Sequence, residues 1–237
     1  MTFIIAEAGV NHDGDIGIAK KLIEVAANAG ADAVKFQAFT PDRLDPPGER
    51  REMLKQLAFT ETDFIALSVH ARANNIEFMV TPFDTYWLNF LVYEKLIQRI
   101  KIASGSLNDI NLLKAAVKIE LPLIISTGMS TPIEINKASV ICETADVVWL
   151  YCKSIYPTKL IDIDLLHMDV LPRPYGFSCH SPSIYPAIAA AALGAVVVEK
   201  HITLNPLAHG PDHKVSLAPE DFKEMVSGIR IVEKCLN

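Results

Sequence analysis

The chain has 237 residues, of which 50% are hydrophobic and 21% are charged, and its formal net charge is −6. This length and composition predict one large globular domain with a full hydrophobic core. Lysine and arginine form no run and the net charge is negative, which excludes a dedicated binder of nucleic acid or of acidic membranes. We therefore expect small-molecule substrates as partners.

Neither the start of the chain nor its cysteines indicate export. Glu7 interrupts the first apolar stretch too early for a secretory signal peptide, and the cysteines show no CxxC spacing. The apolar run 187–198 is too short to span a membrane. We expect free thiols, no membrane partner and a cytoplasmic location.

Strand-like and helix-like stretches alternate along the whole chain, as in parallel sheets covered by helices. Strands are predicted at 3–6, 33–37, 77–80, 99–103, 121–126, 147–151, 175–178 and 196–201. Helices are predicted from residue 16, at 63–74, 89–95, 108–117, 132–142 and 183–193, and from residue 219. Asp13 or Asp15 is expected to cap the first helix. The Pro- and charge-rich segment 40–58 is expected to form a loop that covers the strand ends as a lid with a mobile tip.

The alternation favours a closed barrel over an open doubly wound sheet. No GxGxxG or Walker-type loop follows a predicted strand, as the open sheet would require for a nucleotide. We predict a TIM (β/α)8 barrel, an α/β fold that spans residues 1–237 as a single domain. Closure of such a barrel sets the last strand beside the first.

Polar residues gather where the predicted strands end, which is where barrels of this kind carry their active sites. Lys35 and Lys101 lie inside predicted strands, where an unpaired buried charge is too costly to persist without a use. The alternative is that both lysines reach water from edge strands. Together with Ser104 and Ser126, they suit a small phosphorylated acid.

Three consecutive strands around the closed barrel end in groups suited to metal and proton chemistry. His180 ends the seventh strand, His201 the eighth and Glu7 the first. Their side chains are expected to point into one mouth, where they could hold a divalent metal and transfer protons. A core or surface role is the alternative for each histidine.

Seven sequence blocks carry a family resemblance. They are IAEAGVNHDG at 5–14, ADAVKFQ at 31–37, TPF at 81–83, KIASG at 101–105, STGM at 126–129, IYPT at 155–158 and EKH at 199–201. In this order they resemble the sialic acid synthase family over nearly the whole chain. The resemblance implies a TIM barrel that condenses phosphoenolpyruvate with an open-chain N-acyl hexosamine or similar aldose. The implied products are a nonulosonic acid and phosphate, and the implied cofactor is a divalent metal, Mn²⁺ or Mg²⁺.

The resemblance also implies roles for individual residues. His180 and His201 match the family's metal ligands, and Glu7 matches its catalytic acid/base. The phosphoenolpyruvate contacts are matched by Lys35, Thr81, Lys101, Ser104, Ser126, Tyr156 and Ser178. The sugar side is assigned to Asn11, Gln37 and Asp212. Glu199 and Lys200 are expected to support the site or the fold rather than to act on substrate.

The chain departs from the family pattern in several places. Ser154 stands where the family commonly has asparagine, and Cys179 where it commonly has aspartate. Cys179 is expected to be an inert buried thiol or a soft metal ligand. No C-terminal antifreeze-like domain is expected, so a homodimer or a separately encoded module would complete the sugar side. The alternative functions are a metal-dependent aldolase or lyase of another donor, and a non-catalytic sugar-binding barrel that needs a partner module.

Overall fold

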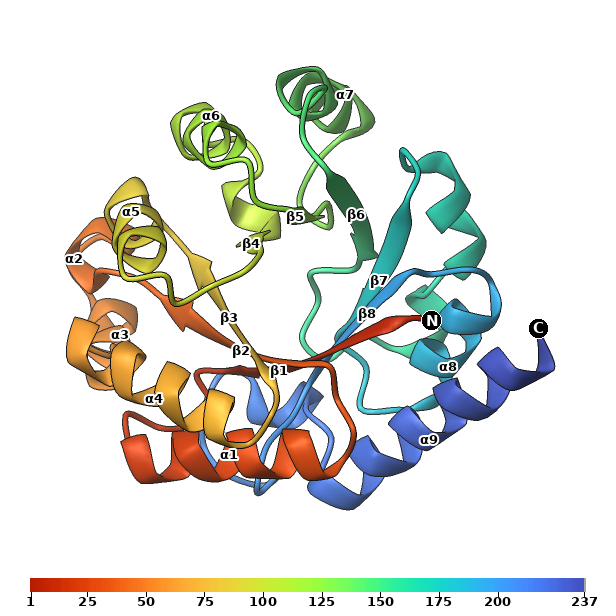
Figure 1. The fold of residues 1–237 in the computed structure, drawn as a ribbon, viewed down its shortest axis with the longest axis horizontal. Coiled ribbons are helices and arrows are strands. Elements are labelled where there is room, and N and C mark those ends of the chain that lie inside the picture. Colours follow the sequence, from red (N-terminus) through yellow and green to blue (C-terminus); the bar gives the residue numbers. More distant parts are fainter. Residues whose placement is uncertain (237) are drawn as a thin grey trace.

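The computed structural model describes residues 1–236, and Asn237, the last residue of the predicted domain, lies outside the described residues. One sheet of eight parallel strands forms the centre of the molecule (Figure 1). The strands are β1 (Phe3–Gly9), β2 (Ala33–Ala38), β3 (Glu77–Pro82), β4 (Ile100–Ile102), β5 (Leu123–Ser126), β6 (Val147–Cys152), β7 (Tyr175–Cys179) and β8 (Val197–His201). The predicted strands are confirmed, and the fold is the predicted TIM barrel.

The last strand lies beside the first, as predicted. Hydrogen bonds join the strands in the order β3-β2-β1-β8-β7-β6-β5-β4, and Glu7 of β1 lies opposite His201 of β8. Within residues 1–236, no hydrogen-bonded ladder joins β3 to β4, although the two strands are neighbours. β4 has only three residues, so the barrel is nearly closed rather than fully hydrogen-bonded around its circumference.

Helices surround the sheet (Figure 1). They are α1 (Ile16–Asn28), α2 (Pro41–Leu44), α3 (Glu49–Leu57), α4 (Glu61–Ala73), α5 (Thr85–Tyr93), α6 (Ile110–Lys118), α7 (Pro132–Ile141), α8 (Tyr185–Ala192) and α9 (Pro219–Cys235). The longest helix of the described chain, α9, starts with Pro219 in its first turn, where the missing N–H costs nothing. Among residues 1–236, no helix combines the length and the apolar character needed to cross a membrane.

Capping side chains set the starts of α5 and α1, of which the sequence pattern misplaced the first. Asp84 accepts a hydrogen bond from the backbone N–H of Trp87, so α5 begins at Thr85 and not at residue 89. Asp15, rather than Asp13, caps α1. Asp13 has a φ of 52° and belongs to the turn before the helix.

The expectation of a loop at 40–58 is wrong, because this segment contains α2 and α3. Its prolines and charges gave a loop-like composition. Leu54 and Leu57 nevertheless lie on one face of α3 and are buried against Val10 and Phe39. The gain from burying this face stabilises a helix whose intrinsic sequence is otherwise strongly polar.

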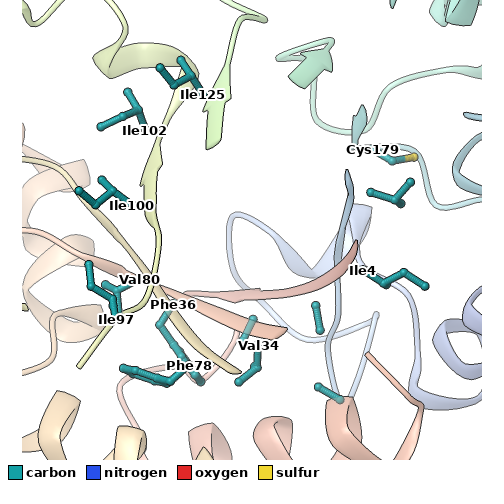
Figure 2. Packing of buried hydrophobic residues seen from close by; sticks show 14 of the residues in the cluster. Ile4, Val34, Phe36, Phe78, Val80, Ile97, Ile100, Ile102, Ile125 and Cys179 are labelled. Carbon is teal, nitrogen blue, oxygen red and sulfur yellow. The ribbon is translucent and has the colours of Figure 1, made fainter. Parts of the chain in front are cut away.

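The core has two layers, one inside the barrel and one between the sheet and the helices. Side chains that point inward form an apolar layer below the strand ends, which consists of Ile5, Ala33, Met79, Ile124, Leu150 and Val197. Side chains that point outward pack under the helices, and Figure 2 shows part of this layer with Ile4, Val34 and Phe36 labelled. This alternation follows the two-residue period of a strand, and it leaves the inward positions nearest the strand ends free for polar groups.

A glycine allows a close approach of β7 to β8. A Cβ at Gly176 would lie 2.3 Å from the carbonyl oxygen of Val197 and 2.6 Å from Cδ2 of Leu150. Gly176→Ala must therefore displace backbone, and we expect it to lower the free energy of unfolding by about 2 kcal/mol or more. Denaturant unfolding measures this loss. Gly48→Ala is the matched control, because nothing lies within 4 Å of that Cβ; equal stability of the two variants would contradict the close approach.

Candidate active site

A cavity of about 580 Å³ opens at the carboxyl ends of the strands, and every strand or the turn after it contributes to its lining. The predicted site residues all belong to the described part of the chain, and all but Asn11 line this cavity. Those that do are Glu7, Lys35, Gln37, Thr81, Lys101, Ser104, Ser126, Tyr156, Ser178, His180, His201 and Asp212. The fold thus brings together residues that are up to about two hundred positions apart.

The centre of the cavity floor is a buried ion network. The ammonium of Lys35 lies 2.6 Å from Oε2 of Glu7 and 3.5 Å from Oε2 of Glu199. The ammonium of Lys101 lies 3.9 Å from Oε1 of Glu199. All four side chains are buried, so the alternative in which the lysines reach water is wrong.

Glu199 has a larger part in the site than the sequence indicated. The sequence predicts a supporting role for both Glu199 and Lys200, but the alternation of β8 separates the two residues. Glu199 and His201 point into the cavity, whereas Lys200 points outward and donates to the carbonyl oxygens of Ser181 and Val215. Lys200 is therefore structural, and Glu199 is a member of the cavity floor.

Hydroxyl and amide groups complete the network. Lys35 donates to Oγ1 of Thr81 at 2.8 Å, and Lys101 donates to Oγ of Ser126 at 2.7 Å. Ser178 donates to Oε1 of Glu199 at 2.9 Å, and Gln37 donates to Oε1 of Glu7 at 2.9 Å. These bonds fix each charged group in one position, which is the condition for electrostatic preorganisation.

The network sets the protonation states of its members. Burial raises the pKa of Glu7, although Lys35 opposes this shift. Burial disfavours the charge of Lys35, but the carboxylates of Glu199 and Glu7 outweigh it and raise the pKa of Lys35. Burial lowers the pKa of Lys101. Burial also opposes the charge of Glu199, yet Lys101 and Lys35 lower the pKa of Glu199 to about 2. Glu199 is therefore a fixed anion. Glu7, whose pKa is raised, is the carboxyl group of the network that takes up a proton more readily.

One side of the cavity, above β4, β5 and β6, is lined by hydroxyl groups. Ser104 accepts a hydrogen bond from the backbone N–H of Gly128 at 3.2 Å. A Cβ at Gly128 would lie 2.8 Å from Oγ of Ser154, so only glycine allows the turn after β5 to pass so close to this serine. With the ammonium of Lys101 at its base, this side offers the donors that a phosphate requires.

Two neutral imidazoles face each other beside the network, with ring centroids 5.4 Å apart. Nδ1 of His180 lies 2.7 Å from the carbonyl oxygen of Lys153, which can only accept, so Nδ1 carries the proton. Nε2 of His180 then accepts from the hydroxyl of Tyr156 at 3.0 Å. Burial lowers the pKa of His180 to about 4 and holds the pKa of His201 well below its ordinary value.

The donor chemistry of this pair fits a divalent metal. A neutral imidazole whose other nitrogen is bound to a carbonyl oxygen, as in His180, is the usual oriented metal ligand. Nδ1 of His201 is buried without a hydrogen-bond partner in the described structure and lies 3.8 Å from Oδ2 of Asp212. Within residues 1–236, no group of three or more histidine, cysteine, aspartate or glutamate side chains is already arranged as a metal cage. The residues present therefore offer two nitrogen ligands with carboxylates nearby.

Two predicted positions lie away from the cavity. Asn11 donates to the carbonyl oxygen of Ile202 at 2.9 Å and to Oγ of Ser216 at 2.8 Å, so it connects two loops. These contacts do not support its assignment to the sugar side.

Cys179 points outward from β7 into the sheet–helix core (Figure 2). The structure therefore supports the inert thiol at Cys179 and not the metal ligand.

A buried histidine fastens the loop that carries Asp212. Nδ1 of His213 lies 2.7 Å from Oγ1 of Thr203, and its Nε2 lies 3.1 Å from Oδ1 of Asp13. The loop after β8 is thus tied to the loop after β1. Burial and the nearby Glu7 raise the pKa of Asp212 to about 7. These contacts hold a carboxyl group at the rim, beside His201.

Sequence reasoning missed the apolar part of the lining. This part comprises Val10, Phe39, Leu44, Met53, Leu54 and Phe83. Apolar side chains in a connection carry no chemical signal of their own, although Leu44, Met53 and Leu54 belong to the segment 40–58, which the sequence predicts to lie over the strand ends. The charged and hydroxyl residues were predictable because strand ends of a parallel barrel meet at one face.

Comparisons with known proteins show the family of this chain. The model of the NeuB family matches residues 22–237. The chain belongs to the NeuB family. A NeuB-family relative, the N,N'-diacetyllegionaminic acid synthase of Campylobacter jejuni, is 38% identical over 259 residues, which cover 99% of this chain and 77% of that enzyme. An uncharacterised protein of Methanocaldococcus jannaschii is 42% identical over 243 residues, which cover 99% of this chain and 72% of that protein.

A solved structure extends the likeness to the fold of this NeuB-family chain. The N-acetylneuraminic acid synthetase of Leptospira borgpetersenii, in complex with citrate, superposes with a TM-score of 0.95 at 34% identity. The match covers 100% of this chain and 85% of that one. Together with the family match, this confirms the resemblance drawn from the seven sequence blocks.

Removal of Glu199 should destabilise the fold. Glu199→Leu leaves Lys101 without its carboxylate partner and Lys35 with one, and an uncompensated buried charge costs about 3 kcal/mol or more. Denaturant unfolding is the measurement, and the second change Lys101→Met should recover part of the loss. The exposed Glu143→Leu is the matched control, with an expected change within about 0.5 kcal/mol. A stability of Glu199→Leu equal to that control would refute the coupling.

Acid should destabilise the protein partly through His12. This ring stacks on Phe59 at 3.9 Å, and burial lowers its pKa from the ordinary 6.5 to about 4. The unfolded chain therefore binds the proton first, so stability is complete above pH 6.5 and falls by about 3 kcal/mol as the pH drops to 4. Unfolding of His12→Phe between pH 7 and 4 should show a shallower loss. The exposed His167→Phe should keep the original slope, and identical slopes for both variants would contradict the assignment.

Proposed function

We propose that this chain is a metal-dependent synthase that condenses phosphoenolpyruvate with an N-acyl hexosamine or a similar aldose. The products are a nonulosonic acid and phosphate. One observation carries the proposal: two buried lysines and a row of hydroxyls lie in the same cavity as Glu7 and a pair of neutral imidazoles. Membership of the NeuB family supports the proposal, and so do its relatives that are named as synthases of such acids.

The hydroxyl-lined side fits phosphoenolpyruvate. Lys101 with Ser104 and Ser126 would take the phosphate, and Lys35 with Thr81 would take the carboxylate. Ser178, which is hydrogen-bonded to Glu199, and Tyr156, which is hydrogen-bonded to His180, would contact phosphoenolpyruvate at opposite ends of its site. Because these groups are already fixed by the ion network, the enol would be oriented without a large rearrangement.

The reaction joins C3 of phosphoenolpyruvate to the aldehyde carbon of the sugar. Water adds to C2, and the bond from C2 to the phosphate oxygen breaks, so that phosphoenolpyruvate, aldose and water yield the acid and phosphate in balance. Glu7 would exchange the associated protons, since burial holds its pKa above the ordinary range and Lys35 lies 2.6 Å away. A divalent ion, Mn²⁺ or Mg²⁺, bound by His180 and His201 would polarise the sugar aldehyde. Gln37 and Asp212 would orient the sugar at the same end.

The test combines purified protein, Mn²⁺, phosphoenolpyruvate and a panel of N-acyl hexosamines. Phosphate release that needs both substrates is expected, and removal of metal by a chelator should abolish it until Mn²⁺ is restored. Phosphoenolpyruvate, but not pyruvate, should protect the protein against thermal unfolding. Protection by pyruvate alone would favour an aldolase or lyase of another donor. The absence of phosphate release with every sugar would overturn the proposal.

A variant that lacks one of the two proposed metal ligands tests the metal site directly. His201→Ala should lower turnover about a hundredfold or more, because even outer-shell changes at metal sites cost up to that much. Its unfolding transition should stay cooperative, and its binding of Mn²⁺ should weaken in titration calorimetry. The exposed His167→Ala is the matched control and should bind Mn²⁺ normally. Normal turnover and metal binding in His201→Ala would contradict the ligand assignment.

A further inference from the structure

A buried lysine lies between the two chain segments that carry the proposed metal ligands. Lys200 is completely buried, and it points away from the cavity because it alternates with Glu199 and His201 along β8. Within residues 1–236, no carboxylate forms an ion pair with its ammonium. A buried charge without a counter-ion is costly, so its hydrogen bonds must account for its presence.

Three backbone carbonyl oxygens accept hydrogen bonds from the ammonium of Lys200. They belong to Cys179 at 3.4 Å, to Val215 at 3.2 Å and to Ser181. Sγ of Cys179 lies further away, at 3.8 Å. An ammonium carries three N–H donors, and each of these carbonyls is a buried acceptor that needs one. A neutral apolar side chain at this position would satisfy none of them.

Two of these carbonyls flank the first imidazole of the pair. Cys179 and Ser181 are the neighbours of His180 in the chain. The ammonium therefore holds the main chain on both sides of the His180 ring. Lys200 itself directly precedes His201 in β8. One side chain thus connects the backbone of both histidines.

The third carbonyl belongs to the loop after β8. Val215 ends the short 3-10 helix at 213–215, and its backbone N–H donates to the carbonyl oxygen of Asp212 at 3.2 Å. Asp212 lines the cavity, with its Oδ2 3.8 Å from Nδ1 of His201. The ammonium of Lys200 therefore also holds the turn that carries this carboxyl group.

The sheet alone does not fix His180 relative to His201. Strands β7 and β8 lie side by side (Figure 1), and within residues 1–236 their ladder ends at the pair Cys179–Lys200. His180 follows this last pair and lies beyond the end of β7. The backbone N–H of Thr158 donates to the carbonyl oxygen of His180 at 3.0 Å, and Lys200 holds the residues on either side.

We propose that Lys200 is a positioning residue of the metal site, which sets the distance between the His180 and His201 rings through the main chain on both sides of His180. A metal ion binds most tightly to ligands whose positions are fixed before it arrives. The inference rests on the proposed function and deepens its metal site. A role in stability alone would leave the affinity for the metal unchanged.

The test is titration calorimetry with Mn²⁺ on the unchanged protein and on Lys200→Met. Methionine has a similar length but no N–H donor, so we expect the Kd for Mn²⁺ to rise about tenfold or more, as for other groups that orient metal ligands. Phosphoenolpyruvate added without metal should protect both proteins equally against thermal unfolding, because Lys101 and Ser104 lie across the cavity. An unchanged Kd, or loss of this protection, would overturn the selective role of Lys200.

Arg230→Met is the matched control, because Arg230 is also a cation that binds a backbone carbonyl. Its guanidinium donates to the carbonyl oxygen of Thr2 and to Oδ2 of Asp32, both at 2.7 Å. These contacts join α9 to the amino-terminal ends of β1 and β2, away from the cavity. We expect lower stability and an unchanged Kd for Mn²⁺. Equal weakening of Mn²⁺ binding in Arg230→Met and Lys200→Met would reduce the effect to destabilisation and overturn the proposal.

Lys200→Arg carries the test if Lys200→Met does not unfold cooperatively. It keeps the charge, but a planar guanidinium cannot replace a compact ammonium among three carbonyls that lie in different directions. We expect cooperative unfolding and a Kd for Mn²⁺ raised severalfold. A Kd equal to that of the unchanged protein would overturn the proposal.

Phosphate release, measured separately, distinguishes this inference from the proposed function. Release of phosphate together with a Kd that does not depend on Lys200 would overturn the inference and leave the synthase standing. A Kd that depends on Lys200, without phosphate release from any sugar, would support the inference and overturn the synthase. The absence of Mn²⁺ binding in the unchanged protein would overturn both.

Discussion

The buried ion network inside the barrel mouth is the constraint on which the rest of the site depends. Two lysines and two glutamates are almost completely buried in the floor of the cavity, and each charge of the network has an opposite neighbour. Isolated burial of any one of them would be far too costly. Lys35 is central because it contacts both Glu7 and Glu199. The network is stable only as a set, and this set places fixed charges where an anionic substrate would enter.

The barrel supports this network from three directions. Below it, the apolar layer that contains Ile5 and Met79 closes the barrel to water. Around it, the sheet–helix core fixes the strands that carry the charges. Above it, His213 ties the loop after β8 to the loop after β1, so the rim with Asp212 is held as well. The charged floor can therefore be rigid even though all its members come from different strands.

The cavity has a polar side and an apolar side because different kinds of chain connection form the two sides. Short turns follow β4 and β5, a longer connection follows β6, and hydroxyl groups of all three face the cavity, such as Ser104 beside Gly128. The opposite side is an insertion of two short helices, which must bury an apolar face to be stable at all. Part of that face lines the cavity. The same hydrophobic gain that folds the insertion also makes this side of the cavity apolar.

Much of the fold and of the polar site could be predicted from the sequence, because the parallel strands of a barrel end at one face and successive residues of a strand point to opposite sides of the sheet. Lys35 and Lys101 stood out as charges inside apolar strands, and the spacing of His180 and His201 put them on adjacent strand ends. Glu199 was underestimated, since the unbroken apolar run before it hides which residues of β8 point inward. Asn11 was assigned to the sugar although its partners, Ile202 and Ser216, lie about two hundred residues away.

The order of strands and helices and the kinds of groups at the strand ends follow from the sequence, because they depend on local periodicity and on the direction of parallel strands. The pairing of those groups depends on contacts between strands that are distant in the chain. The pKa of Glu7 and the fixed charge of Glu199 depend on burial and on neighbours from other strands. The incomplete pairing of β3 with β4 and the apolar part of the cavity lining likewise depend on the tertiary structure, since both are contacts between segments that are distant in the chain.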